Sequence, residues 1–114
     1  MTDKFIALVN LIYDERAEIT SITRSGTEYY FYFRNYAFSV LRKEQGLGMF
    51  AYTKWRGPIE DLIRSMDSGL EGGDLTVVPV KLSTSEAREK IAALYDWIDR
   101  KSLGLDELFS DLGL

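Results

Sequence analysis

Three groups of acidic residues come closest, by type and spacing, to a catalytic or metal-binding site. They are Asp14 and Glu15 with Glu18, Glu60 with Asp61, and Asp96 with Asp99 and Arg100. Clustered carboxylates can bind Mg²⁺ or act as a paired acid and base. Carboxylates near a helix start are also favoured by the helix macrodipole, and the other groups fall on the solvated faces of predicted helices. We therefore predict surface residues here and no metal site.

The sequence lacks the side chains that most other kinds of catalytic site use. The sequence contains no histidine and no cysteine, which excludes imidazole-based triads, imidazole or thiolate metal sites and thiolate nucleophiles. The glycine-rich segment LEGGD, residues 70–74, lacks the Lys and Ser/Thr of a phosphate-binding loop, and no G-x-S-x-G motif surrounds a serine. We predict that LEGGD is a plain loop and that the chain is not an enzyme and needs no cofactor.

The size and charge of the chain limit the classes of partner. Its 114 residues are enough for one hydrophobic core, so we expect a single α+β domain over residues 1–114. Residues 1–58 carry six acidic and eight basic side chains, whereas residues 59–114 carry twelve and six, which gives the net charge of −4. Nucleic-acid binders usually have a basic excess, because phosphate contacts supply most of their affinity. Nucleic acid is therefore a less favoured partner than protein.

No segment has the length and composition of a membrane anchor. The most apolar run near the start, FIALVNLIY at residues 5–13, is interrupted by Asn10 and is too short to span a bilayer. No small-residue cleavage site follows it. The lack of cysteine is compatible with a reducing compartment. We expect a cytoplasmic protein that makes no membrane contact.

The helices are predicted by apolar residues at helical spacing. This spacing occurs at residues 3–16, at 59–68, at 83–101 and again within 105–114. Ser83 with Glu86 forms a capping-box pattern at the start of the third segment. We expect the first and the long C-terminal helix to cover a sheet.

The strands are predicted from Glu18 to Trp55, where apolar and polar residues alternate with a period of two. Turns at Ser25-Gly26 and Asn35-Tyr36 give three strands, and a fourth follows the turn-rich segment KEQGLG at residues 43–48, which makes a four-stranded meander. Residues 74–82 predict a fifth strand, which Pro79 restricts to an edge or a bulge. The predicted fold is therefore α+β, an antiparallel sheet of about five strands with N-terminal and C-terminal helices packed mainly on one face.

The stretch TEYYFYFRNYAF, residues 27–38, contains seven aromatic rings that the strand period divides between two faces. A turn at Asn35-Tyr36 predicts the pairs Phe33 with Phe38, Phe31 with Val40, Tyr32 with Ser39, and Tyr30 with Leu41. We call one side the Phe face, which is Phe31, Phe33, Phe38 and Val40. The other side is the Tyr face, which is Tyr30, Tyr32, Arg34, Ser39 and Leu41. The first hairpin is expected to add Ser21 opposite Tyr30 and Thr23 opposite Glu28.

The Tyr face and its surroundings form the first candidate binding surface. Ten of the chain's aromatic residues lie between Tyr29 and Trp55, and residues 19–58 carry six basic side chains against two acidic ones. Aromatic rings beside cations can stack bases, hold a ring-containing ligand or form a protein interface. The same rings can simply be cross-strand pairs. The candidate residues are Tyr30, Tyr32, Arg34, Tyr52, Lys54 and Trp55.

The C-terminal segment LDELFSDLGL is the second candidate. Its apolar residues are Leu105, Leu108, Phe109 and Leu112. Such an acidic amphipathic helix can insert into the groove of a partner. For so small a core we favour the alternative, in which the segment folds back onto its own sheet.

The function class that these observations favour is a small non-enzymatic protein-interaction module. Inhibitors, immunity proteins and adaptors include acidic domains of this size, although this is an analogy of size and fold. The expected partner is another protein or a second copy of the chain, as in a homodimer. The alternative is a binder of a small ligand, a nucleotide or single-stranded nucleic acid on the aromatic and basic sheet surface.

Overall fold

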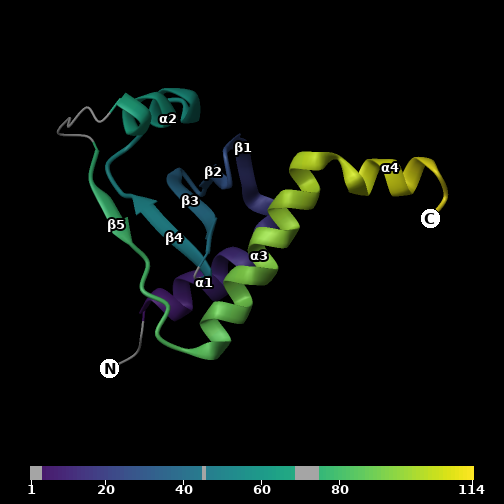
Figure 1. The fold of residues 1–114 in the computed structure, drawn as a ribbon, viewed down its shortest axis with the longest axis horizontal. Helices are drawn as coiled ribbons and strands as arrows, with labels where there is room; N and C mark the ends of the chain where they lie inside the picture. Colours follow the sequence, from purple (N-terminus) through teal and green to yellow (C-terminus); the bar gives the residue numbers. More distant parts are fainter. Residues whose placement is uncertain (1–3, 45, 69–74) are drawn as a thin grey trace.

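The computed structural model describes residues 4–44, 46–68 and 75–114, and within these ranges it shows a five-stranded antiparallel sheet with four α-helices (Figure 1). The strand order follows the chain order. The strands are β1 (Ile19–Ser25), β2 (Glu28–Phe33), β3 (Tyr36–Lys43), β4 (Gly46–Tyr52) and β5 (Val77–Pro79). The helices are α1 (Lys4–Asp14), α2 (Ile59–Ser68), α3 (Ser85–Leu103) and α4 (Leu105–Asp111), and a 3₁₀ turn spans Arg16–Glu18. The predicted α+β class and five-stranded sheet are confirmed.

The main core lies between the Phe face and the helices α1 and α3. Phe31 and Val40 are fully buried there, and the Phe31 and Phe38 rings stack with their centroids 5.8 Å apart. The helices contribute an apolar stripe made of Val9, Ile12, Ile91, Leu94 and Ile98. The period-two strands and the period-3.6 helices therefore meet as predicted, because each has one apolar side to bury.

A second, smaller core lies on the Tyr face under α2. Ile59 and Leu62 of this helix are buried against Tyr30, Ala37 and Tyr52. Figure 1 shows α2 and α3 on opposite sides of the sheet. The Phe face thus carries two helices and the Tyr face carries one.

The β2–β3 turn lies one residue earlier than the sequence predicted. Arg34 and Asn35 form the two-residue loop and both have positive φ, at 49° and 67°, which is the backbone of a hairpin turn whose twist suits the flanking strands. Asparagine tolerates this conformation well. Phe33 therefore pairs with Tyr36.

The predicted cross-strand pairs are wrong for the same reason, but the predicted faces are right for the residues within the strands. Arg34, which was predicted on the Tyr face, lies in the turn instead, with its guanidinium 5.1 Å from the centre of the Phe33 ring. Phe31 is opposite Phe38, Tyr30 is opposite Ser39 and Tyr32 is opposite Ala37. Moving a two-residue loop by one position shifts every pair by two residues. Because side chains alternate with a period of two, each residue keeps its face.

The first hairpin differs from prediction in its turn and in a bulge. Its loop is Gly26-Thr27, with Gly26 at φ 64°, so Ser25 pairs with Glu28 and Thr23 with Tyr30. The register then shifts between Thr20 and Thr23, where Ser21 has φ 59°. This bulge lies in β1, which is an edge strand.

The opposite edge and the start of α3 differ from prediction in extent, since β5 covers only Val77–Pro79 where a strand was predicted over residues 74–82. β5 is the other edge strand, and Pro79 lies opposite Phe50, where a missing N–H is tolerated. The cap of α3 is Thr84, whose side chain accepts a hydrogen bond from the Ala87 N–H, so the predicted Ser83 cap is off by one residue. The predicted LEGGD loop lies outside the described residues. Within the described residues, no helix is long and apolar enough to cross a bilayer.

Candidate functional site

The two tyrosines at the centre of the first candidate surface are buried. Tyr30 is 3% exposed and Tyr52 is 1% exposed, with ring centroids 5.8 Å apart. The Tyr30 hydroxyl donates to Glu28 at 3.0 Å, and Ser39 donates to the other oxygen of the same carboxylate at 2.7 Å. The Ser39 and Tyr52 hydroxyls are 2.9 Å apart. These four side chains form one hydrogen-bonded network beneath α2.

The network holds its phenols in the neutral form. Burial raises the pKa of Tyr52 to about 12, and the charge of Glu28 acts in the same direction. Burial also raises the pKa of Tyr30, helped by its Tyr52 and Glu28 neighbours. In the described part of the chain, every buried side-chain nitrogen or oxygen has a hydrogen-bond partner. A fully satisfied network of neutral hydroxyls around the Glu28 carboxylate fixes the packing of α2 on the sheet.

Two further candidate residues hold the loop that leads into α2. The Tyr32 hydroxyl donates to the Gly57 carbonyl at 2.5 Å, and Trp55 Nε1 donates to the same oxygen at 2.9 Å. Burial raises the pKa of Tyr32 as well. Both side chains are half-buried. Their polar atoms thus bind the protein's own backbone.

The two candidate cations lie apart from these rings. Arg34 is in the β2–β3 turn and pairs with Glu18 at 2.8 Å, with both side chains about half exposed. Its bond to Glu18 raises the pKa of the Arg34 guanidinium and lowers the pKa of the Glu18 carboxyl. Lys54 is exposed beyond the end of β4. The structure therefore brings Tyr30 together with Tyr52, but it does not join the six residues into one open surface.

A shallow hollow of about 390 Å³ on this side is lined by Thr20, Tyr32, Asn35 and Arg56. Sequence reasoning did not select Arg56, whose guanidinium lies 4.9 Å from the centre of the Tyr36 ring. The signal available for it was its place directly before Gly57-Pro58, in the connection to α2. Only one tyrosine of the Tyr face contributes to this hollow.

The acidic groups have ordinary partners. Asp99 accepts a hydrogen bond from Tyr29, Asp61 pairs with Arg64, and Asp96 lies 3.5 Å from Arg42. Among the described residues, no three carboxylates are gathered in a way that could hold a metal ion. Their arrangement suggests structural and surface roles.

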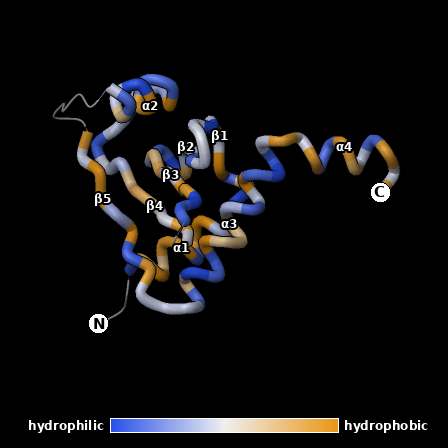
Figure 2. The backbone as a smooth tube through the Cα atoms, viewed as in Figure 1, coloured by the Kyte–Doolittle hydropathy of each residue, from blue (hydrophilic) through white to orange (hydrophobic). Residues whose placement is uncertain are grey.

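The second candidate, the C-terminal helix α4, is the most exposed apolar element in the described part of the chain. Leu108 is 48% exposed, Phe109 38% and Leu112 65%, while Leu105 is half-buried and no residue of α4 is buried. Figure 1 shows α4 leaving the end of α3 and pointing away from the sheet, and Figure 2 shows apolar residues recurring along it. The prediction that this segment folds back onto its own sheet is wrong.

The position of α4 has a clear physical basis. Gly104 ends α3 in the left-handed conformation at φ 69° and turns the chain. Arg100 then pairs with Asp106 at 2.9 Å across this turn. Both faces of the sheet are already covered, by α1 and α3 on one side and by α2 on the other. Little apolar sheet surface is therefore left for α4 to cover.

Comparisons of this chain with protein-family models, with curated proteins and with solved structures find no match. Its function is therefore inferred from its own residues.

Proposed function

We propose that this chain is a non-enzymatic protein-interaction module of the inhibitor, immunity or adaptor type, acting in the cytoplasm, and that α4 is its binding element. The observation that carries the proposal is the exposure of an amphipathic helix in which no residue is buried and Leu108 and Phe109 are 48% and 38% exposed. Leu105, Leu108, Phe109 and Leu112 follow the spacing i, i+3, i+4 and i+7. This is the spacing with which helices enter the groove of a partner.

The energetics of α4 support the same conclusion. A seven-residue helix has little stability of its own in water, and most helical stability in proteins comes from packing an apolar side. Burying an exposed Leu or Phe side chain contributes about 1.5–3 kcal/mol when burial is complete. A partner that covers Leu108 and Phe109 therefore stabilises both the complex and the helix.

The Tyr face gives less support to the alternative, a nucleotide or single-stranded nucleic-acid binder. Stacking needs accessible rings, and α2 covers Tyr30 and Tyr52. The acidic residues of α4 also disfavour a phosphate-bearing ligand near that end of the molecule.

A capture experiment tests the proposal. The protein is immobilised and exposed to an extract of its source cells, supplemented with a differently tagged copy of the chain. We expect at least one protein, or the tagged copy, to be retained by the wild type and lost with Leu108→Gln and Phe109→Gln together. Glutamine keeps helix propensity while removing the apolar groups.

The matched control is Val77→Thr, which changes another exposed apolar side chain, 37% exposed, on β5. It should retain the same proteins as the wild type. If the wild type and the α4 variant capture identical sets, or neither captures anything, α4 is not a binding element and the proposal fails.

A further inference from the structure

We infer that the partner of α4 is a second copy of this chain, and that α4 docks on the outer surface of α1 and α3 of that copy. This inference rests on the proposed function of α4. It adds the identity of the partner and the surface that receives the helix.

The receiving surface is a cluster of cations on aromatic rings. Arg16 lies 4.4 Å from the centre of the Tyr13 ring and 5.9 Å from that of Trp97. Lys90 lies 4.9 Å from the Tyr13 ring, and Lys101 lies 5.6 Å from the Trp97 ring. Both rings are half-buried. We call these five residues the cationic cluster.

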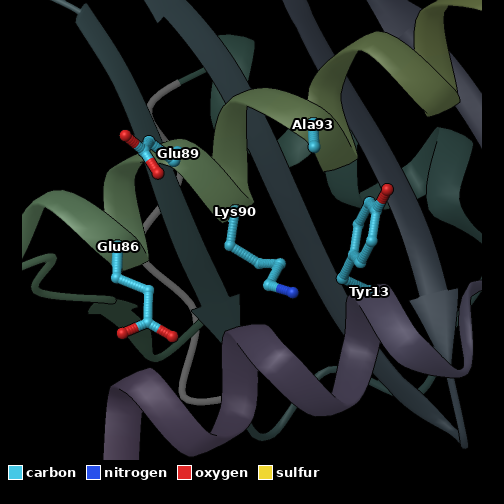
Figure 3. Close-up of a pocket in the computed structure, with 5 residues that line it drawn as sticks. All are labelled: Tyr13, Glu86, Glu89, Lys90 and Ala93. Atoms are coloured by element: carbon cyan, nitrogen blue, oxygen red, sulfur yellow. The ribbon is translucent and has the colours of Figure 1, made fainter.

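A groove between α1 and α3 adjoins the cationic cluster. It has a volume of about 280 Å³ and is lined by Tyr13, Glu86, Glu89, Lys90 and Ala93. Figure 3 shows Glu86 and Lys90 extending from α3 toward α1, with the Tyr13 ring beside the small Ala93 side chain. The groove thus has an apolar part next to Tyr13 and an acidic part next to Glu86.

Charge complementarity selects α4 as the occupant. Residues 105–114 contain no basic residue, and besides Asp106, which pairs with Arg100 of the same copy, they carry Glu107 and Asp111. The cationic cluster contributes Arg16, Lys90 and Lys101 around two half-buried rings. We expect Leu108 and Phe109 to pack on the part of these rings that stays exposed. Opposite charges around an apolar centre are typical of a specific interface.

The acidic part of the groove orients the docked helix. Glu86 and Glu89 belong to the first turns of α3, whereas Trp97 and Lys101 lie toward its end. Like charges are repelled from the first end, so α4 should lie over the second. Within one copy α4 points away from α1 (Figure 1), which leaves this surface free for a second copy.

A two-fold arrangement satisfies both copies at once. The receiving end of α3 directly precedes α4, so two α3 ends placed side by side can exchange their α4 helices. Each copy then supplies one helix and one cationic cluster, and the contact closes without further growth. The expected product is a dimer.

Sedimentation velocity over a concentration series tests the inference. We expect reversible dimerisation by the wild type, weakened by salt because exposed charges contribute. The double variant Leu108→Gln and Phe109→Gln should stay monomeric. Two charge-reversal variants then test the two sides of the interface, which are α4 and the cationic cluster. The helix variant carries Glu107→Lys and Asp111→Lys, and the cluster variant carries Lys90→Glu and Lys101→Glu.

Mixing the two charge-reversal variants provides the decisive measurement. Each variant alone places like charges against each other, and its dimer dissociation constant should rise by about tenfold or more. In a mixed pair, the basic helix meets an acidic cluster and the acidic helix meets a basic cluster. We expect a one-to-one heterodimer with near wild-type affinity.

The outcomes separate this inference from the proposed function. A wild type that is monomeric at all accessible concentrations overturns the inference, and so does a cluster variant that dimerises like the wild type. If α4-dependent capture of another protein persists in either case, the proposed function stands with a different partner. If that capture is also absent, both fail.

Discussion

The Tyr face and the C-terminal helix were the two candidate binding surfaces, and they differ in burial, since the first is covered and the second is exposed. Tyr30 and Tyr52, which suggested an open platform, are covered by α2. Leu108 and Leu112, which were expected to help close the core, are exposed. The dense aromatic residues of the Tyr face thus belong to a second small core, whereas the apolar residues of the C-terminal helix form the exposed surface.

The difference teaches that periodicity assigns a residue to a face without showing what covers that face. The alternation within β2 separates Phe31 from Tyr30 whatever lies above each of them. Whether a face is open depends on how many helices the chain provides and where their connections let them pack. Here three helices occupy the two faces of the sheet, and the fourth extends beyond them.

Truncating a buried side chain of the Tyr face should produce the largest effect on stability. Tyr52→Ala removes a ring that is 1% exposed, and we expect the free energy of unfolding to fall by about 3–5 kcal/mol, as for other large buried aromatics. Urea denaturation followed by far-UV circular dichroism measures this loss. Tyr52→Phe is the control, since it keeps the ring and should cost about 1 kcal/mol. A loss below that of the control would mean that the Tyr face is open in solution.

Alkaline pH should destabilise the same network. The folded-state pKa of Tyr52 is raised to about 12 from an ordinary value of 10.0. Its neutral form is therefore favoured by folding, and this contribution is complete below about pH 10 and is lost as pH rises toward about 12, up to roughly 3 kcal/mol.

Denaturation curves of the wild type and Tyr52→Phe between about pH 9 and 12 measure this contribution as a difference. The variant lacks the phenol, so its stability should decline less steeply over this window. Parallel curves for the two proteins would contradict the burial of an unionised Tyr52 hydroxyl.

The turn that separates α4 from α3 should show an intermediate effect. Gly104 has φ 69°, and an added Cβ would meet only Glu107 at 3.8 Å, so the cost of Gly104→Ala is conformational and not steric. We expect a loss of about 1 kcal/mol. Gly104→Asn should cost less, because asparagine adopts this conformation more readily. Equal stability of the two variants in thermal unfolding would argue against the left-handed turn.

Truncating an exposed side chain of α4 should have the smallest effect on the stability of the isolated chain. Leu108 is 48% exposed, and Leu108→Ala should change the free energy of unfolding by no more than about 0.5 kcal/mol. The measurement is made at a concentration low enough to keep the chain monomeric. A loss comparable to that of Tyr52→Ala would show that α4 packs on its own domain after all.

The sequence was sufficient for the strands, the helices and the sides of the sheet, because these depend on local period and turn residues. It placed Pro79 at an edge or a bulge for the same reason. It missed the Arg34-Asn35 loop by one position, since Asn35 suits either turn. The coverage of Tyr30 by α2 was not predicted, because the apolar stripe from Ile59 to Met66 shows that the helix packs but does not show on which face.

The bulge at Ser21 has a consequence for how copies of this chain can meet. β1 ends the sheet with unpaired backbone groups, and a straight edge of that kind can continue into a neighbouring molecule without limit. The residue at φ 59° breaks the flat ladder that such growth requires. Fibre-like polymerisation through the β1 edge is therefore disfavoured, which is compatible with the proposed dimer, where association through the helices stops at two subunits.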